Sequence, residues 1–314
     1  MKAFFCDHQN KSVGLQVALL TVGHEIVGHP DHADVVFADY PVHWHGDRLA
    51  ILEAAHARGA LCLGYQHGGP PTMQYDGIAQ PCPTLTADLV HGEGHAELMR
   101  RIGYPVPVHV AGWHYCKTRK FKPPDKIRHV LFAPAHPWAD GHTNQDYWYD
   151  LNRRAYQALE AYECEQKTVR FFGSLAANGI YPQPGITLTR SRLDNIRGQV
   201  KQIDQADLVI ADGTFAYLAI ARGKPTIMVA QNRIVHNDTA TLTVNVERWE
   251  AYKDYLRWPY DFDDGPFPDT AEAARQGSER ADEWKSLFVG EQLDPEDLDD
   301  YLQELAATQL GVTA

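Results

Sequence analysis

The feature of this sequence that most constrains its fold is a repeated alternation of apolar, strand-like runs with helical runs. Early in the chain, ADVVFADYP (33–41) and ALCLGY (60–65) alternate with segments such as GDRLAILEAAHARG (46–59). A basic stretch with two prolines, WHYCKTRKFKPPDKI (113–127), interrupts the alternation, which restarts at RHVLFAPAHP (128–137). Such alternation is typical of a parallel sheet with helices on both faces. The sequence therefore predicts an α/β protein with two Rossmann-type parallel-sheet domains.

The composition break gives the expected domain boundaries. We expect an N-terminal domain at 1–115, a linker at 116–127, a second domain at 128–265 and C-terminal helices at 266–314 that pack back on the first domain. A total of 314 residues is enough for two domains of roughly 100–150 residues each.

Local signals indicate where individual helices lie. In residues 11–23, Val13, Val17 and Leu20 recur near helical spacing. In the second helical segment, Asp47 is positioned to cap the helix N-terminus.

Composition and charge exclude several classes of protein. The 44% hydrophobic and 22% charged residues are ordinary for a soluble globular chain. The formal net charge of -12 repels polyanions, which disfavours nucleic acid as the main partner unless basic residues cluster locally. The start of the chain does not resemble a signal peptide, and no run of about 18 apolar residues predicts a membrane span. We therefore expect a cytoplasmic protein.

Cysteine and histidine usage gives no sign of a metal site. The five cysteines are odd in number and form no CxxC pair. Histidine pairs occur in HWHGD (43–47) and HGEGH (91–95), but neither has the spacing of a helical zinc site. We expect no bound metal.

Ligands of open α/β sheets bind beyond the carboxyl ends of the strands. Four polar turns follow predicted strands here: DHQN (7–10), QHGGPP (66–71), APAHPWADGHTN (133–144) and ADGTFAY (211–217). The sequence therefore predicts that the functional residues lie in these turns, which would line a cleft between the two domains.

The ADGTFAY turn joins an apolar strand to a helix. A helix that starts at the end of a strand offers free N–H groups and a positive dipole end to an anion. Thr214 adds a hydroxyl, and Gly213 lets a ligand approach the backbone. An ordinary N-cap and turn would produce the same pattern. Arg190 and Ser191 also follow a strand and are candidates to hold a phosphate, although an exposed arginine at a helix start is the commoner explanation.

The QHGGPP turn places a histidine beside two glycines and two prolines. An imidazole with a pKa near 6.5 is largely neutral at pH 7 and can take a proton from a hydroxyl. The glycines, Gly68 first, keep the approach to His67 open. We expect His67 to be a catalytic base; the alternative is a histidine bonded within a tight turn.

The order of these motifs resembles the GT-B glycosyltransferases, in particular their UDP-N-acetylglucosamine 2-epimerase and CDP-glycerol glycerophosphotransferase relatives. The strand, DGT turn, helix and Gly223-Lys224-Pro225 triplet are similar to the nucleotide-sugar half of those proteins. HVLFAPAHPW resembles the opening of their second domain, and YQHGGPPT resembles their HGTPLK turn. The chain departs from the family in having no glutamate in the helix after the DGT turn.

This resemblance, together with the positions of polar residues directly after predicted strands, gives roles to individual residues. The first domain would bind the acceptor and carry the catalytic candidates, and the second would bind the donor. The catalytic candidates are His67, Asp7 and Glu93, although Glu93 is equally suited to cap a helix. The residues implied in binding the donor are His8, Gly68, His136, Asn144, Arg190, Ser191, Asp212, Gly213, Thr214 and Phe215.

The resemblance implies a metal-independent transferase that moves a sugar or related group from a nucleotide-activated donor, of UDP type, to a hydroxyl acceptor. It implies no permanently bound cofactor. Four alternatives stay open: a UDP-sugar 2-epimerase, a CDP-glycerol-type phosphotransferase, a phage-type DNA glycosyltransferase, and a non-catalytic nucleotide-sugar binding protein.

Overall fold

The computed structural model separates the chain into two compact units. Among the residues that it describes, unit 1 contains those up to Tyr115 and those from Ser286 onward, and unit 2 contains Cys116–Lys285. The described residues are 1–6, 12–39, 46–66, 82–101, 104–134, 145–171, 173–190, 196–211, 213–229, 261–262, 282–283 and 285–309.

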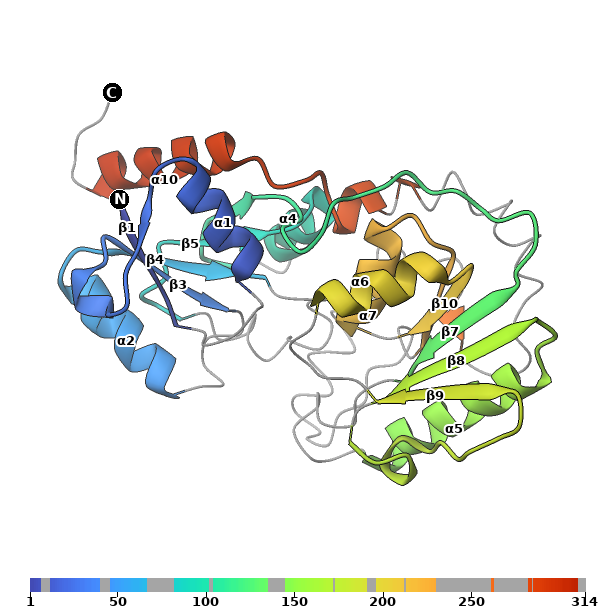
Figure 1. Ribbon diagram of the computed structural model, residues 1–314. Helices are drawn as coiled ribbons and strands as arrows, with labels where there is room; N and C mark the ends of the chain where they lie inside the picture. The colour runs from blue at the N-terminus through green and yellow to red at the C-terminus, as the bar shows by residue number, and fades with distance from the viewer. Residues whose placement is uncertain are drawn as a thin grey trace. The chain divides into compact units, whose positions relative to one another are not determined.

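Unit 1 contains a parallel six-stranded sheet with the strand order β2-β1-β3-β4-β5-β6. Figure 1 labels β1, β3, β4 and β5 of this sheet. Every neighbouring pair of strands is parallel, as the strand–helix alternation predicts. The strands are β1 (Lys2–Phe5), β2 (Glu25–Ile26), β3 (Val35–Asp39), β4 (Leu61–Tyr65), β5 (Ala87–Val90) and β6 (Val108–Val110).

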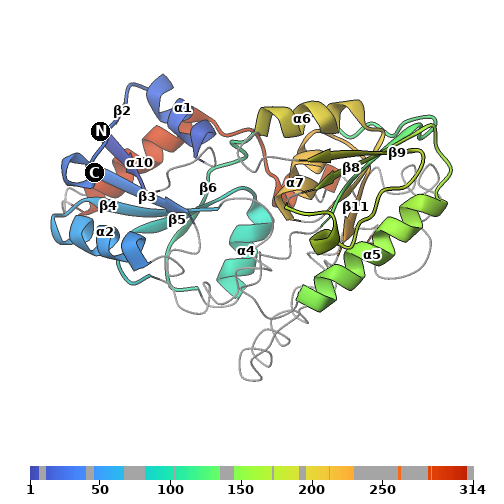
Figure 2. The ribbon, with the colours of Figure 1, turned by 60° about the horizontal axis from the view of Figure 1, so that its bottom comes forward.

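Helices cover both faces of this sheet (Figure 2). The helices α1 (Val13–Thr21) and α10 (Pro295–Gln309) cover one face. The opposite face is covered by α2 (Gly46–Ala57) and α4 (Glu93–Arg101), and a short 3-10 helix spans Pro30–His32. Alternate residues of each strand enter the two cores, which is the period of a strand buried on both sides.

The buried face of α1 is not the one suggested by the spacing of its apolar residues. Val13, Val17 and Leu20 are 46%, 56% and 54% exposed, whereas Leu15 and Leu19 are buried in the core with α10. Because nearly every position of this helix is apolar, periodicity does not distinguish its faces, and packing against α10 decides which one is buried.

The start of α2 also differs from the expectation. The helix begins at Gly46, so Asp47 lies inside its first turn and not at the N-cap position. A carboxylate in the first turn still interacts favourably with the helix dipole.

Unit 2 contains a second parallel six-stranded sheet, with the order β12-β11-β10-β7-β8-β9. The chain runs outward from β7 to β9, returns to pair β10 with β7, and continues outward on the other side. This is the strand order of the dinucleotide-binding Rossmann fold. The strands are β7 (His129–Ala133), β8 (Gln166–Phe171), β9 (Ile186–Arg190), β10 (Leu208–Ala211), β11 (Thr226–Val229) and β12 (Asp261–Phe262).

The helix α5 (Gln145–Ala161) covers one face of this sheet, and α6 (Ile196–Gln205) and α7 (Gly213–Ala221) lie on the other (Figure 1). A 3-10 helix spans Ala176–Asn178. On α5 the predicted apolar face is confirmed, because Leu151, Ala155 and Leu159 are buried against the strands.

The basic stretch after unit 1 packs along the end of α7. Arg119 N donates to Ala221 O at 2.7 Å, and Lys122 N donates to Gly223 O at 3.2 Å. Gly223 has φ +69°, and a Cβ at this position would lie 2.2 Å from Lys120 O. Only glycine fits here, because the stretch passes directly over a backbone in the left-handed region.

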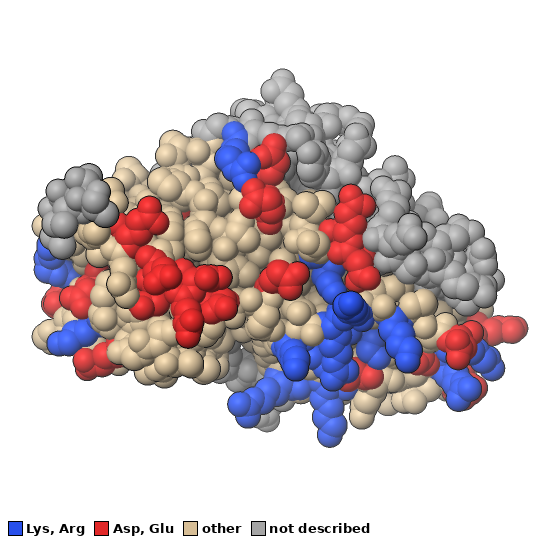
Figure 3. Space-filling view, turned by 90° about the horizontal axis from the view of Figure 1, so that it is seen from above, with Lys and Arg blue, Asp and Glu red and all other residues tan. Residues whose placement is uncertain are grey.

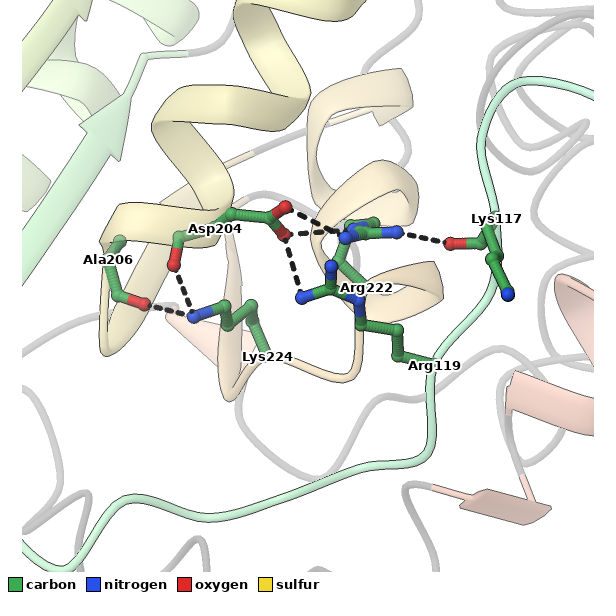
Figure 4. Close-up of polar contacts among 6 residues, drawn as sticks. All are labelled: Lys117, Arg119, Asp204, Ala206, Arg222 and Lys224. Carbon is green, nitrogen blue, oxygen red and sulfur yellow. Dashed lines mark hydrogen bonds and ion pairs between the residues drawn. The ribbon is translucent and has the colours of Figure 1, made fainter.

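Hydrogen bonds and ion pairs of polar side chains connect the ends of α6 and α7 with this stretch (Figure 4). The guanidinium of Arg222 donates to both carboxylate oxygens of Asp204, at 2.8 and 2.9 Å, and to Lys117 O at 2.6 Å. Lys224 Nζ donates to the carbonyl oxygens of Asp204 and Ala206. The Gly-Lys-Pro triplet therefore has a structural role at the amino end of the strands.

Candidate functional site

The point at which the strand order of unit 2 reverses lies between β7 and β10. These strands are parallel neighbours, and their last residues, Ala133 and Ala211, are paired in register. In open α/β sheets the ligand binds beyond the carboxyl ends of the strands at this reversal. The topology therefore brings together the residues from which two of the turns singled out in the sequence start, Ala133 at the end of β7 and Ala211 at the end of β10.

The helix α7 begins directly at this edge. Gly213, Thr214 and Phe215 form its first turn, and Thr214 is half-buried. The first N–H groups of a helix have no partner within the helix and point toward its N-terminal end. The prediction that a helix starts at Gly213 is confirmed. That this turn binds an anion stays a prediction.

Arg170 enters the same edge from the neighbouring strand. Phe132 of β7 pairs with Val169 of β8, so the next step of the register sets Arg170 beside Ala133. Arg170, Ala133 and Ala211 thus occupy three adjacent strands at one level. Alternation along each strand directs all three side chains to the face that carries α7. The two alanine methyl groups leave room on that face for the long arginine side chain.

The Arg170 side chain reaches the first turn of α7. Its guanidinium carbon lies 4.9 Å from the centre of the Phe215 ring, within the range of a cation–π contact. Arg170 is only 4% exposed, and burial lowers its pKa to about 10. The guanidinium therefore stays positively charged at neutral pH. A buried cation beside a helix N-terminus is an arrangement suited to a phosphate or diphosphate.

Arg190 lies apart from this buried group. It is the last residue of β9, the edge strand, and is exposed. The other predicted donor-binding residues of this half, His136, Asn144, Ser191 and Asp212, lie outside the described residues.

Asp7, His8, His67 and Gly68 also lie outside the described residues. Of the catalytic candidates, only Glu93 is described. It sits in the first turn of α4, where its exposed carboxylate pairs with Arg100.

Glu93 also lines a shallow pocket of about 220 Å³ within unit 1. Glu291, Asp294 and Asp297 contribute three further carboxylates to the pocket, alongside His109. Such an acidic lining repels the phosphates of a nucleotide, so this pocket is not suited to the donor.

A buried group of histidines lies at the carboxyl edge of the unit 1 sheet. His91 and His95 follow β5 and His114 follows β6, and all three are at most 9% exposed. The His91 ring lies 5.3 Å from that of His114 and 4.8 Å from that of Trp113, measured between centroids. The carboxyl ends of these strands therefore form a compact aromatic layer.

Gln66 ties this layer to the end of β4. Its Oε1 accepts a hydrogen bond from His91 N at 3.2 Å, and its Nε2 lies 3.3 Å from His95 Nε2. Because Oε1 is the acceptor, Nε2 is the donor and His95 Nε2 accepts. Burial lowers the pKa of His95 to about 3, so the ring is neutral at pH 7. Gln66 immediately precedes His67 in the sequence.

Sequence reasoning missed two components of these edges. Arg170 carried a signal, since a charged residue in the middle of the apolar run KTVRFF is unusual. His91 and His95 were noted only as a histidine pair without metal spacing, and the described part of the chain contains no group of three or more His, Cys, Asp or Glu side chains that could hold a metal ion. None of the described helices is long and apolar enough to cross a membrane.

Comparison with solved structures relates both units to one fold. A variant of the wall teichoic acid polymerase TagF is 10% identical over 99% of this chain and 90% of its own, with a TM-score of 0.54. A protein described as a UDP-N-acetylglucosamine 2-epimerase from Listeria monocytogenes is 13% identical over 95% of this chain and 78% of its own, with a TM-score of 0.51. The chain has the GT-B fold. The resemblance inferred from its turns and the predicted pair of parallel sheets are therefore confirmed.

Within this GT-B fold, the specific activity is not defined by likeness to known proteins. No protein-family model matches the chain, and no curated protein matches it in sequence. The match to the structure of TarM has 10% identity and a TM-score of 0.47 and covers 55% of TarM. The chain therefore spans about half the length of that protein.

Proposed function

We propose that this GT-B protein transfers a sugar from a nucleotide-activated donor to a hydroxyl acceptor. The observation that carries the proposal is the position of Arg170, a buried cation on β8 that contacts the first turn of α7 at the strand-order reversal of unit 2. Positive charge from a guanidinium and from helix N–H groups meets there, at the carboxyl edge of the sheet.

This arrangement supports binding of the donor by its diphosphate. When the bond between the sugar and the diphosphate breaks, negative charge grows on the leaving oxygen. Arg170 and the N–H groups of Gly213 and Thr214 would stabilise that charge without having to move, because the sheet and α7 already hold them. Phosphate oxygens accept charge-assisted hydrogen bonds from the N–H groups of a helix N-terminus and from an arginine guanidinium.

In the same proposal, unit 1 supplies the base. His67 would accept the proton of the acceptor hydroxyl as its oxygen forms a bond to the sugar carbon and the diphosphate leaves. Gln66, bonded to the histidine layer, would position the turn that carries His67. The reaction then balances with the proton on the imidazole and the electron pair on the diphosphate.

The proposal is tested by nucleotide binding to the full chain. Thermal unfolding is measured with UDP, GDP, CDP, ADP and dTDP, with UDP-N-acetylglucosamine, and with CDP-glycerol. A ligand that binds only the folded state stabilises it by about 2.7 kcal/mol at 100 times its Kd. We expect one nucleoside diphosphate and its sugar conjugate to raise the melting temperature.

These thermal shifts, together with a turnover assay, distinguish among enzyme classes. A shift with CDP-glycerol alone favours the phosphotransferase alternative, and turnover of a UDP-sugar without an acceptor favours an epimerase. No shift with any nucleotide would exclude the donor site at Arg170.

A further inference from the structure

The described surface of unit 2 carries a concentration of basic side chains. Six of the 29 Lys and Arg residues fall within residues 117–128, against one of the 41 acidic residues. Together with two exposed residues of α6 they form what we call the basic strip. Its members are Lys117, Arg119, Lys120, Lys122, Lys126, Arg128, Arg197 and Lys201, all exposed. Figure 3 shows Lys and Arg side chains gathered on one part of the surface of a chain whose net charge is -12.

The basic strip is continuous from α6 onto the irregular stretch before β7. Arg119 lies 3.7 Å from the carboxylate of Asp204, measured between Nη1 and Oδ1. Arg197 and Lys201 precede Asp204 on α6 at positions i-7 and i-3, and therefore share its helix face. The contact of Arg119 with Asp204 joins the two halves of the strip, as Figure 4 shows for the residues around Asp204.

Structural roles account for only part of this charge. Arg222 already contacts both carboxylate oxygens of Asp204 through two guanidinium nitrogens. Lys126 Nζ and Arg128 Nε lie 3.5 and 3.9 Å from Glu165 Oε1. The remaining five basic residues have no ion pair among the described residues. These five are Lys117, Lys120, Lys122, Arg197 and Lys201. Exposed basic side chains that cluster on a surface without ion pairs are typical of a surface that binds a polyanion.

We propose that the basic strip binds the phosphodiester backbone of a nucleic acid. The five basic residues without an ion pair offer contacts to several phosphates of such a chain. Two carboxylates lie beside the strip: Glu165 near Lys126, and Asp282, which accepts a hydrogen bond from Phe121 N at 3.2 Å. Stable membrane docking adds inserted apolar side chains to such basic residues, and the large exposed hydrophobic residues of the described chain lie outside the strip.

The basic strip is separate from the proposed donor site. Residues 117–122 of the strip lie where α6 and α7 end, and the donor site lies where α7 begins. Nine residues of helix separate the two ends of α7, which is about 13 Å. Arg197, in the first turn of α6, is the member of the strip that lies toward the carboxyl edge. Binding to residues 117–122 therefore leaves the donor edge open, and it is measured without any donor. The inference does not rest on the transferase proposal and can fail independently of it.

The test is fluorescence anisotropy of a labelled 20-base-pair DNA duplex with the full chain at 50 to 300 mM NaCl. Five phosphate contacts predict that log K falls against log salt with a slope of about -4.5. The triple variant Lys117→Gln, Lys120→Gln, Lys122→Gln removes three contacts and should reduce the slope to about -2, with affinity at 100 mM NaCl at least about tenfold weaker. A matched variant, Lys2→Gln, Arg58→Gln, Arg153→Gln, removes the same charge elsewhere on the surface.

The inference is supported if the strip variant loses affinity and slope while the matched variant behaves like the wild type. A labelled single strand reports whether the duplex form matters, and vesicles of phosphatidylglycerol provide the membrane comparison. The inference is overturned if the wild type does not bind DNA at 50 mM NaCl. It is also overturned if both triple variants bind DNA equally, or if the strip variant loses vesicle binding while retaining DNA binding.

Discussion

The guanidinium carbon of Arg170, on β8, lies 4.9 Å from the ring centre of Phe215, in the first turn of α7. The two residues are 45 positions apart in the chain, and the parallel register of β8, β7 and β10 brings them together. Their contact places a buried positive charge at the helix end where the strand order of unit 2 reverses. Most of the predictions about donor binding follow from this relationship.

Replacing Arg170 by lysine should weaken binding of nucleoside diphosphates. Lysine retains a charge but loses the planar fork that bonds two phosphate oxygens. Charge-assisted hydrogen bonds contribute about 1.5–3 kcal/mol each, so we expect UDP, or whichever diphosphate binds, to lose roughly 10- to 100-fold in affinity by calorimetry. The corresponding nucleoside without phosphate should bind the variant and the wild type equally. Arg153→Lys, at a half-exposed arginine on α5, is the control. Equal losses for nucleoside and diphosphate would show that Arg170 holds the fold and not the phosphates.

Removing the imidazole of His67 should abolish turnover and leave donor binding intact. General base catalysis contributes about 10²- to 10⁴-fold, so we expect His67→Ala to lower kcat by that factor at pH 7. The donor Kd should change by less than about twofold, because the proposed donor contacts lie in unit 2. His56→Ala, an exposed histidine on α2, controls for the loss of a surface imidazole. Wild-type turnover in His67→Ala would remove this residue from the mechanism.

A methyl group at Gly290 should destabilise unit 1. Gly290 has φ +73°, and a Cβ at this position would lie 2.0 Å from His91 O. A left-handed conformation costs a non-glycine residue about 1–2 kcal/mol, and the clash adds to that, so Gly290→Ala should lower the free energy of unfolding by about 2 kcal/mol or more. Gly28→Ala, where a Cβ meets no atom within 4 Å, should change stability by less than about 0.5 kcal/mol. Urea unfolding of both variants makes the comparison, and equal stabilities would contradict this account of the segment before α10.

Neutralising Asp88 should remove a pH dependence of stability. Burial raises the pKa of Asp88 to about 7 from 3.8, against the opposing effect of the hydrogen bond from Tyr104. Between these values the folded state binds a proton that the unfolded state does not, so this group stabilises the fold below about pH 4. That contribution is lost as the pH rises to about 7. The stability of Asp88→Asn relative to the wild type should therefore increase with pH across this window, by up to about 1.4 kcal/mol per unit.

The protonation of His95 also makes stability depend on pH. The effect of Asp88 is therefore measured as the difference in stability between Asp88→Asn and the wild type. The pKa of His95 is lowered to about 3 by burial, so between about pH 3 and 6.5 the unfolded state binds the extra proton and stability rises with pH. The two slopes oppose each other in the wild type, and the curve of a single protein would hide both. Subtracting the wild-type curve from that of Asp88→Asn in urea titrations from pH 4 to 8 isolates the aspartate. A flat difference would show that Asp88 is not protonated in the folded state.

The helices and strands follow largely from local sequence, since apolar periodicity and glycine stops act over a few residues. The ordered succession of strand and helix was sufficient to predict parallel sheets, and turns at strand ends were sufficient to predict that α7 begins at Gly213. Where every position is apolar, as in α1, periodicity fails and the neighbour α10 decides that Leu15 and Leu19 are buried while Val17 is exposed.

The sequence by itself determined the two α/β halves and the helix start at Gly213, because strand alternation and turn chemistry are encoded locally. Only the tertiary structure decided that Arg170 stands beside α7, that Gln66 joins His91 to His95, and that exposed lysines of the linker stretch continue onto α6. The physical reason is that strand order and register bring together residues far apart in sequence. No local pattern specifies which strand becomes the neighbour of which.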